Sequence, residues 1–145
     1  MQPTISLRFL LFVSGLLATG IGASILFDPA AFHATHGIEL GSDANLMSEV
    51  RAPGGALMVL GLLMLLGVWV RTFTLAATSI AAAVYLAYGA SRLVSLALDG
   101  VPAPGLVGAT AIELALGAAC LFALVHAMRH SSANGRESTT PAEAL

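Results

Sequence analysis

Apolar residues fall into four long runs that short polar segments separate. The runs cover residues 5–27, 46–70, 73–98 and 105–128. As helices, each can cross the hydrocarbon core of a bilayer, which is about 30 Å thick. They are apolar on all sides, whereas helices of soluble proteins carry one apolar stripe. We therefore predict an all-α integral membrane protein, folded as an antiparallel four-helix bundle.

The connections between the runs carry helix boundary signals. Asp28 can cap a helix that starts at Pro29, and Gly37 can end it, which predicts a short interfacial helix over residues 29–36. Ser42 or Asp43 can cap the second span. The first run could instead be a signal peptide, but its apolar core is longer than the usual 7 to about 15 residues, so we assign it to the mature chain.

The arginines that flank the spans predict the orientation. Four of them fall on one side if the spans alternate: Arg8, Arg71, Arg129 and Arg136. The positive-inside rule makes that side cytoplasmic, with both termini inside, in a bacterial inner membrane. Residues 129–145 are polar and lack apolar periodicity, which predicts a disordered cytoplasmic tail after the membrane domain of residues 1–128.

Composition excludes several classes of function. Hydrophobic residues make up 57% of the chain and charged residues 10%, far below the charged share of about 25% in soluble domains. The net charge is −2 and lysine is absent, so we expect no nucleic-acid partner. Cys120 is the single cysteine, which rules out an internal disulfide. His33 and His36 share a helix face without a third ligand, so we predict neither a metal nor a cofactor.

Four charged residues lie deep in the predicted spans: Glu49, Arg51, Arg92 and Glu113. Arg92 is seven residues before Asp99 and Glu113 is eight after Gly105, so the two are level across an antiparallel hairpin. Arg51 is twenty residues from Arg71, which puts it about 30 Å from the cytoplasmic turn, as Arg92 is. Charge in hydrocarbon is costly, so these residues mark a candidate site in the outer leaflet.

The third and fourth spans carry matching polar stripes. On the third, Tyr85, Tyr88 and Arg92 recur at three- and four-residue steps and should face the bundle interior. We predict a buried ion pair between Arg92 and Glu113. Glu49 and Arg51 are about 200° apart around a helix, so both cannot face one point. The predicted ligand-binding or ion-pair network is Glu49, Arg51, Tyr85, Tyr88, Arg92 and Glu113.

Several motifs carry a family resemblance. They are Glu49-Val-Arg51-Ala52-Pro53-Gly54-Gly55, Tyr85-x-x-Tyr88-Gly89-x-x-Arg92, Asp99-Gly100-x-Pro102, and Glu113 with Gly117. Over residues 7–127 the chain resembles the bacterial domain-of-unknown-function 4345 family. The resemblance implies a small four-helix membrane protein, related at fold level to the DoxX-like proteins, some of which accompany redox enzymes. It implies no established activity.

Three functions remain open at this stage, besides a purely structural role for the ion pair. The favoured one is a non-enzymatic protein that binds a small ligand or lipid in a charged outer pocket, because no nucleophile or metal triad is recognisable. The second is a small proton-coupled exporter that uses Glu113. The third is a membrane isomerase or redox-accessory subunit, with Glu113 or Glu49 as base. No catalytic residue is assigned, and the sequence leaves homo-oligomerisation open.

Overall fold

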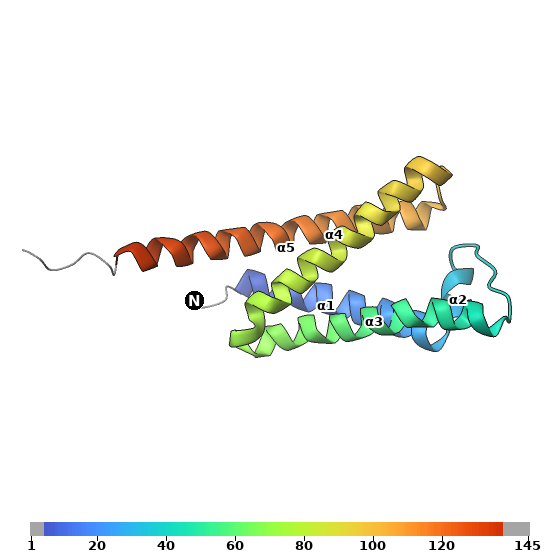
Figure 1. Cartoon of the computed structure of the whole chain (residues 1–145), viewed down its shortest axis with the longest axis horizontal. Helices are drawn as coiled ribbons and strands as arrows, with labels where there is room; N and C mark the ends of the chain where they lie inside the picture. The colour runs from blue at the N-terminus through green and yellow to red at the C-terminus, as the bar shows by residue number, and fades with distance from the viewer. Residues whose placement is uncertain (1–4, 138–145) are drawn as a thin grey trace, which may run out of the picture.

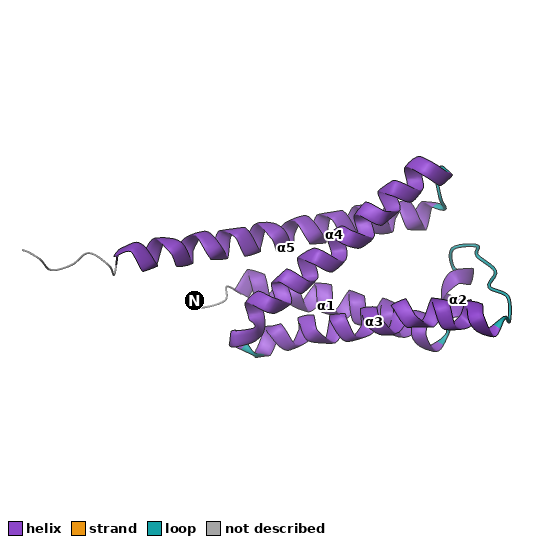
Figure 2. Cartoon of the chain, in the orientation of Figure 1, coloured by secondary structure: helices purple, strands orange, loops and turns teal. Residues whose placement is uncertain are grey.

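The computed structural model describes residues 5–137, with side chains as far as Arg129. Every element in this part of the chain is a helix (Figures 1 and 2). The helices are α1 (Ile5–Phe27), α2 (Pro29–Ala34), α3 (Ala44–Trp69), the 3-10 turn η1 (Arg71–Phe73), α4 (Thr74–Asp99) and α5 (Pro104–Glu137). The four long helices are each long and apolar enough to cross a membrane. The protein is therefore an all-α, multi-pass membrane protein, and the predicted fold class is confirmed.

Capping groups set the boundaries of the first connection. The Asp28 side chain accepts a hydrogen bond from the backbone N–H of Ala31 at 3.1 Å, and α2 starts at Pro29 as predicted. The helix ends at Ala34 instead of residue 36, because the chain turns there toward Gly37, whose φ is 75°. Asp43, not Ser42, caps α3 by accepting from the two N–H groups that follow Ala44, each at 3.0 Å.

The helices α1 and α3 pack backbone against backbone. A Cβ atom added at Gly22 would lie 2.3 Å from the Met58 nitrogen and 2.7 Å from the Gly54 oxygen. One added at Gly61 would lie 2.4 Å from the Thr19 nitrogen. Any side chain at these positions would collide with main-chain atoms of the other helix. Only glycine therefore permits this approach, as at many contacts between membrane helices.

The helices α4 and α5 form the second pair, in which leucine side chains fill the spaces over glycines. A Cβ added at Gly89 would meet the Leu114 side chain at 2.6 Å, and one added at Gly117 would meet the Leu86 side chain at 2.8 Å. The glycines of the predicted stripes thus permit close contact between the two spans. At Gly89 the nearest main-chain atom of Leu114 is 3.4 Å away, whereas at Gly117 the Leu86 nitrogen is at 2.9 Å, almost as near as the side chain.

The two pairs join at the end that holds Arg8 and Arg71, here called the arginine end. The Thr74 hydroxyl donates to the Gly67 carbonyl at 2.9 Å across the α3–α4 turn. A buried core follows, in which Leu11 and Met64 are fully enclosed. Farther along, the Tyr85 hydroxyl donates to the carbonyl of Ser14 at 2.6 Å and links α4 to α1.

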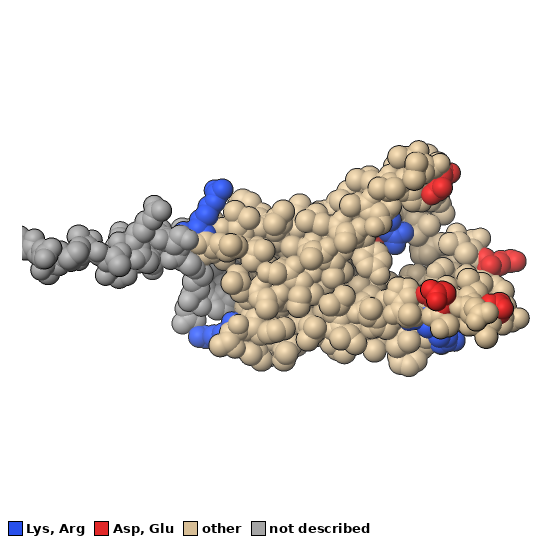
Figure 3. All heavy atoms as spheres, viewed as in Figure 1, with Lys and Arg blue, Asp and Glu red and all other residues tan. Residues whose placement is uncertain are grey.

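The two pairs separate toward the opposite end, which holds Asp28, Asp43 and Asp99 and is here called the acidic end. The last buried residue of α4 is Gly89, and none from Ala90 to Asp99 is buried. Figure 1 shows the far part of α4 and the start of α5 diverging from the α1–α3 pair. Figure 3 shows a hollow between these two arms, with a basic side chain on its wall and acidic side chains near its rim.

The last helix is longer than the sequence analysis predicted. The candidate span ends at Arg129, close to the predicted residue 128, but α5 continues to Glu137. Residues 129–137 of the predicted tail are therefore helical. The sequence has no proline between Pro104 and Pro141 that would stop the helix. The rest of the predicted tail lies outside the described residues.

Candidate functional site

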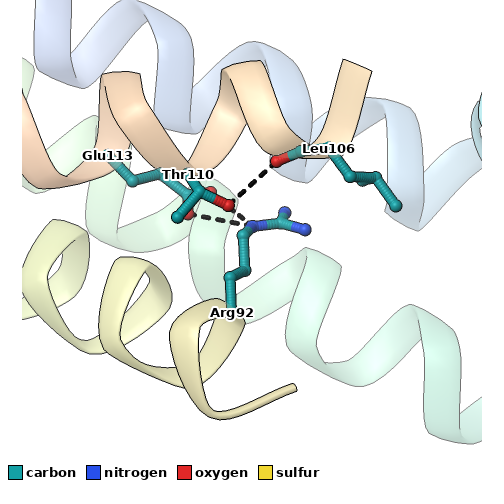
Figure 4. Close-up of polar contacts among 4 residues, drawn as sticks. All are labelled: Arg92, Leu106, Thr110 and Glu113. Carbon is teal, nitrogen blue, oxygen red and sulfur yellow. Dashed lines mark hydrogen bonds and ion pairs between the residues drawn. The ribbon is translucent and has the colours of Figure 1, made fainter. Parts of the chain in front are cut away.

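The predicted ion pair joins α4 to α5 in the half of the bundle where the arms separate. Arg92 Nε donates to both carboxylate oxygens of Glu113, at 3.1 Å to Oε1 and 2.9 Å to Oε2 (Figure 4). The two side chains come from residues that the hairpin between Asp99 and Pro104 makes level. The ion pair predicted from residue counting is therefore confirmed.

The pair is only partly buried, which corrects the prediction of a buried salt bridge. The Arg92 side chain is 33% exposed and the Glu113 side chain 14%. The prediction placed the polar stripe of this span toward the bundle interior. Beyond Gly89, however, no residue of α4 is buried, and Arg92 lies in this part of the helix. The ion pair therefore lies on the wall of the hollow between the arms.

Arg92 uses only part of its donor capacity on Glu113. In the part of the chain that the structure describes, Nη1 and Nη2 have no hydrogen-bond partner, and Figure 4 shows both pointing away from the carboxylate. These atoms carry N–H groups in a planar fork that matches two oxygens of a carboxylate or phosphate. Glu113 thus fixes the guanidinium by one edge and leaves the other edge available.

Tyr88 and Thr110 lie close to the pair. Tyr88 is half-buried, and its hydroxyl lies within electrostatic range of both Glu113 and Arg92. Thr110 lies beside Glu113 in Figure 4, but its hydroxyl donates to the Leu106 carbonyl at 2.9 Å, one turn back along α5. The site on this wall therefore consists of a cation, an anion and a phenol, with a threonine methyl at its edge.

The other tyrosine of the predicted network has a different role. Tyr85 is 6% exposed, and its hydroxyl donates its hydrogen bond to the Ser14 carbonyl. Its ring packs with the core that joins the two helix pairs. Tyr85 therefore contributes to the packing below the hollow and not to its wall. Sequence spacing placed both tyrosines on one face, but it could not indicate that the α1 backbone reaches one of them.

Among the described residues, Arg51 and Glu49 of the predicted network make no hydrogen bond or salt bridge to the ion pair. Arg51 Nη1 donates to the carbonyls of Leu26 and Phe27, with 3.3 Å to the second. Arg51 thus caps the free carbonyls at the C-terminal end of α1. Glu49 is exposed and makes no hydrogen bond or ion pair with the described residues. Arg51 and Glu49 therefore lie on the α1–α3 arm, and the ion pair lies on the α4–α5 arm.

The α1 carbonyls were a partner that the sequence analysis missed. The last carbonyls of any helix lack partners within it, and Phe27 ends the first span at the depth predicted for Arg51. That coincidence was the available signal.

For the histidines, His33 Nδ1 lies 2.8 Å from the Pro29 carbonyl. Among residues 5–137, no three His, Cys, Asp or Glu side chains lie close enough to hold a metal.

Comparison with known sequences gives the family. The profile of a family described as Domain of unknown function (DUF4345) matches residues 6–124. The chain belongs to the DUF4345 family. That range contains α1 to α4 and the part of α5 that bears Glu113, so the DUF4345 match includes the whole candidate site. No curated protein and no solved structure matches the chain. Kinship with DoxX-like proteins stays a prediction.

Proposed function

We propose that this protein binds a small amphipathic anion, such as a lipid with a carboxylate or phosphate head, in the hollow beside Arg92. The observation that carries the proposal is the free edge of the Arg92 guanidinium, which Glu113 holds by Nε alone. A cation held in this way needs little further ordering when two ligand oxygens approach it. In the predicted orientation, the hollow opens on the outer side of the membrane.

The surroundings of Arg92 suit an amphipathic ligand. Beyond Gly89, the exposed residues of α4 include Leu93, Val94 and Leu98. These side chains make the surface of α4 around the site apolar. Tyr88 offers a further hydroxyl donor within the same charged neighbourhood. The ligand would therefore enter sideways from the lipid as well as from the aqueous end.

Binding accounts for the site better than the two alternatives. An exporter would use Glu113 as a proton carrier, but its carboxylate is held by two hydrogen bonds from Arg92. An isomerase would use a base with a donor opposite it, and the other acid proposed for that role, Glu49, makes no contact with the pair. No specific observation favours either, so binding is the function we propose.

The test measures thermal stabilisation of the protein in a neutral maltoside detergent. The probes are decyl phosphate and decanoate, with decanol as a control of equal chain length and no charge. We expect both anions to raise the melting temperature, and decanol to leave it unchanged. Arg92→Gln should weaken the response to both anions about tenfold or more, because it removes the charged fork.

Two variants separate the geometry of Arg92 from its charge. Arg92→Lys keeps the charge but loses the planar fork, so we expect it to retain only part of the response. Arg71→Gln removes an exposed cation at the arginine end and is the matched control, which should respond as the native protein does. A response that survives in Arg92→Gln, or one that decanol reproduces, contradicts the proposal.

A further inference from the structure

A second, separate groove lies on the other arm, at the start of α3. It has a volume of about 660 Å³ and is open along one side. Its walls come from Leu26 of α1 and from α3 residues between Ala44 and Ala56. None of the residues that form the Arg92 site lines it. It is a shallow surface depression that is open over most of its extent.

The floor of the groove follows one face of α3. Ala44, Ser48, Ala52 and Ala56 recur at four-residue steps, which places them in a row along the helix. Their short side chains leave space that a row of leucines would fill. Gly55 extends this floor toward α1, where a Cβ added to it would still be 3.6 Å from the Leu26 side chain. The groove is therefore a consequence of small residues at helical spacing.

Arg51 supplies the single charge of the groove. Its Nη1 is held by the last carbonyls of α1, at Leu26 and Phe27. Its Nε and Nη2 have no hydrogen-bond partner among the described residues, and the side chain is exposed. Ser48, one turn earlier on the same face, adds a hydroxyl donor. No acidic residue lines the groove, so it presents an uncompensated, fixed cation.

The depth of Arg51 indicates what kind of group it meets. Arg51 is twenty residues from Arg71, which corresponds to about 30 Å along a helix, the thickness of a bilayer's hydrocarbon core. With Arg71 at one boundary of the core, Arg51 lies at the other, at the level of lipid phosphates. From there, Ala52, Gly55 and Ala56 continue toward the bilayer centre. A lipid whose charged head lies at Arg51 and whose apolar chain lies along Ala52, Gly55 and Ala56 would therefore match both parts of the groove.

We infer that this groove binds one membrane phospholipid, with its phosphate on Arg51 and Ser48 and an acyl chain along Ala52 to Ala56. Charge complementarity selects this occupant. A helix from a second copy of the chain would bring apolar residues against Arg51 and remove its charge from water without a partner, which is unfavourable. A phosphate diester supplies oxygens to the free guanidinium edge and leaves the α1 cap in place.

Native mass spectrometry in a neutral maltoside detergent can test this inference. The probe is dioleoyl phosphatidylglycerol, compared with dioleoylglycerol, which has the same chains without the phosphate. We expect the native protein to retain one phosphatidylglycerol more than Arg51→Gln does. We expect it to retain neither dioleoylglycerol nor inorganic phosphate at equal concentration. Arg51→Gln should weaken retention about tenfold or more.

Two further variants keep the result interpretable. Ala56→Phe fills the groove from an exposed position and leaves Arg51 on its carbonyls, so it should weaken retention as much as Arg51→Gln does. Arg71→Gln removes an exposed cation that belongs to neither site and should retain the lipid normally. Suppose that Arg51→Gln loses phosphatidylglycerol but Ala56→Phe retains it normally. Then only the cap on α1 has been disturbed, and the inference is overturned.

Other outcomes also decide the matter. If Arg51→Gln retained phosphatidylglycerol and Ala56→Phe lost it, the claim that Arg51 binds the lipid phosphate would be overturned. If the native protein retained inorganic phosphate as well as it retains phosphatidylglycerol, a lipid would be excluded as the specific occupant. A dimer that dissociates in Ala56→Phe would assign the groove to a second copy of the chain. Because Arg92→Gln tests the hollow and Arg51→Gln the groove, failure of either proposal leaves the other intact.

Discussion

The α1–α3 pair and the α4–α5 pair both hold two apolar helices together, but their contacts differ. In the first pair, glycines such as Gly22 and Gly61 bring main-chain atoms of the two helices into contact. In the second, leucine side chains cover Gly89 and Gly117, and an ion pair joins the helices nearer their acidic end. The first pair is held along its length, whereas the second combines packing with one polar link.

This difference shows where the protein can accommodate change. Main-chain contacts cannot rearrange without separating the helices, because the backbone has no rotamers. Leucine side chains can change rotamer, and a partly exposed ion pair can exchange partners. We therefore expect side-chain rearrangement to be easier at Gly89 and around the ion pair than between α1 and α3.

The largest effect is expected from Gly22→Ala. The added methyl group would collide with the Met58 nitrogen and the Gly54 oxygen, so we expect a loss of about 3 kcal/mol in unfolding free energy. Thermal or SDS-induced unfolding in detergent measures it. Gly20→Ala is the matched control, since an added Cβ there meets nothing within 4 Å. Equal stability of the two variants would contradict the backbone contact between α1 and α3.

A double-mutant cycle on Arg92 and Glu113 comes next. Each of Arg92→Ala and Glu113→Ala should cost about 2 kcal/mol, because each leaves a charged group without its hydrogen-bond partner. The double variant should cost no more than either single one, since no charge is left behind. Additive losses would show that the two side chains stabilise the bundle through separate contacts.

Gly89→Ala tests the packing of the second pair. The new methyl group would meet the Leu114 side chain at 2.6 Å, but the Leu114 nitrogen is 3.4 Å away. A shift of that leucine can relieve the contact, so we expect a loss of about 1 kcal/mol, well below that of Gly22→Ala. The same unfolding titration compares them, and a loss as large as that of Gly22→Ala would remove the distinction between the pairs.

Tyr85→Phe should have the smallest effect. It removes the hydrogen bond to the Ser14 carbonyl but keeps the ring in the core between the pairs. Hydrogen bonds between membrane helices contribute about 0.6 kcal/mol on average, and we expect a loss of that order. A loss above that of Gly89→Ala would mean that the pairs are joined mainly by this polar contact.

The helices and their order could be predicted because they depend on local properties of the chain. Four apolar runs of sufficient length, with Asp28 and Asp43 as caps, fix the spans and their connections within a few residues. The Arg92–Glu113 pair was also predictable, since a short hairpin makes residues at equal distances from its turn level. Both inferences need only the rise of a helix and the thickness of a bilayer.

The separation of the two arms was not predictable from these properties. Depth along a helix follows from counting, but it does not say which neighbour a residue faces. Arg51 and Arg92 are each twenty residues from the turn between α3 and α4, and the difference in their partners depends on how far α4 leans away from α3. That angle results from packing near Ala77, Ala81 and Ala82, where small residues on α4 bring the arms together only at the arginine end.

The length of α5 affects how the protein can be labelled and detected. Eight residues continue the helix from Arg129, where the candidate span ends, to Glu137, which corresponds to about 12 Å at the rise of an α-helix. An epitope or fluorophore fused after this extension would stand clear of the lipid headgroups, on a short helical stalk. Antibody access to such a tag in sealed vesicles would report directly which face of the membrane the arginine end occupies.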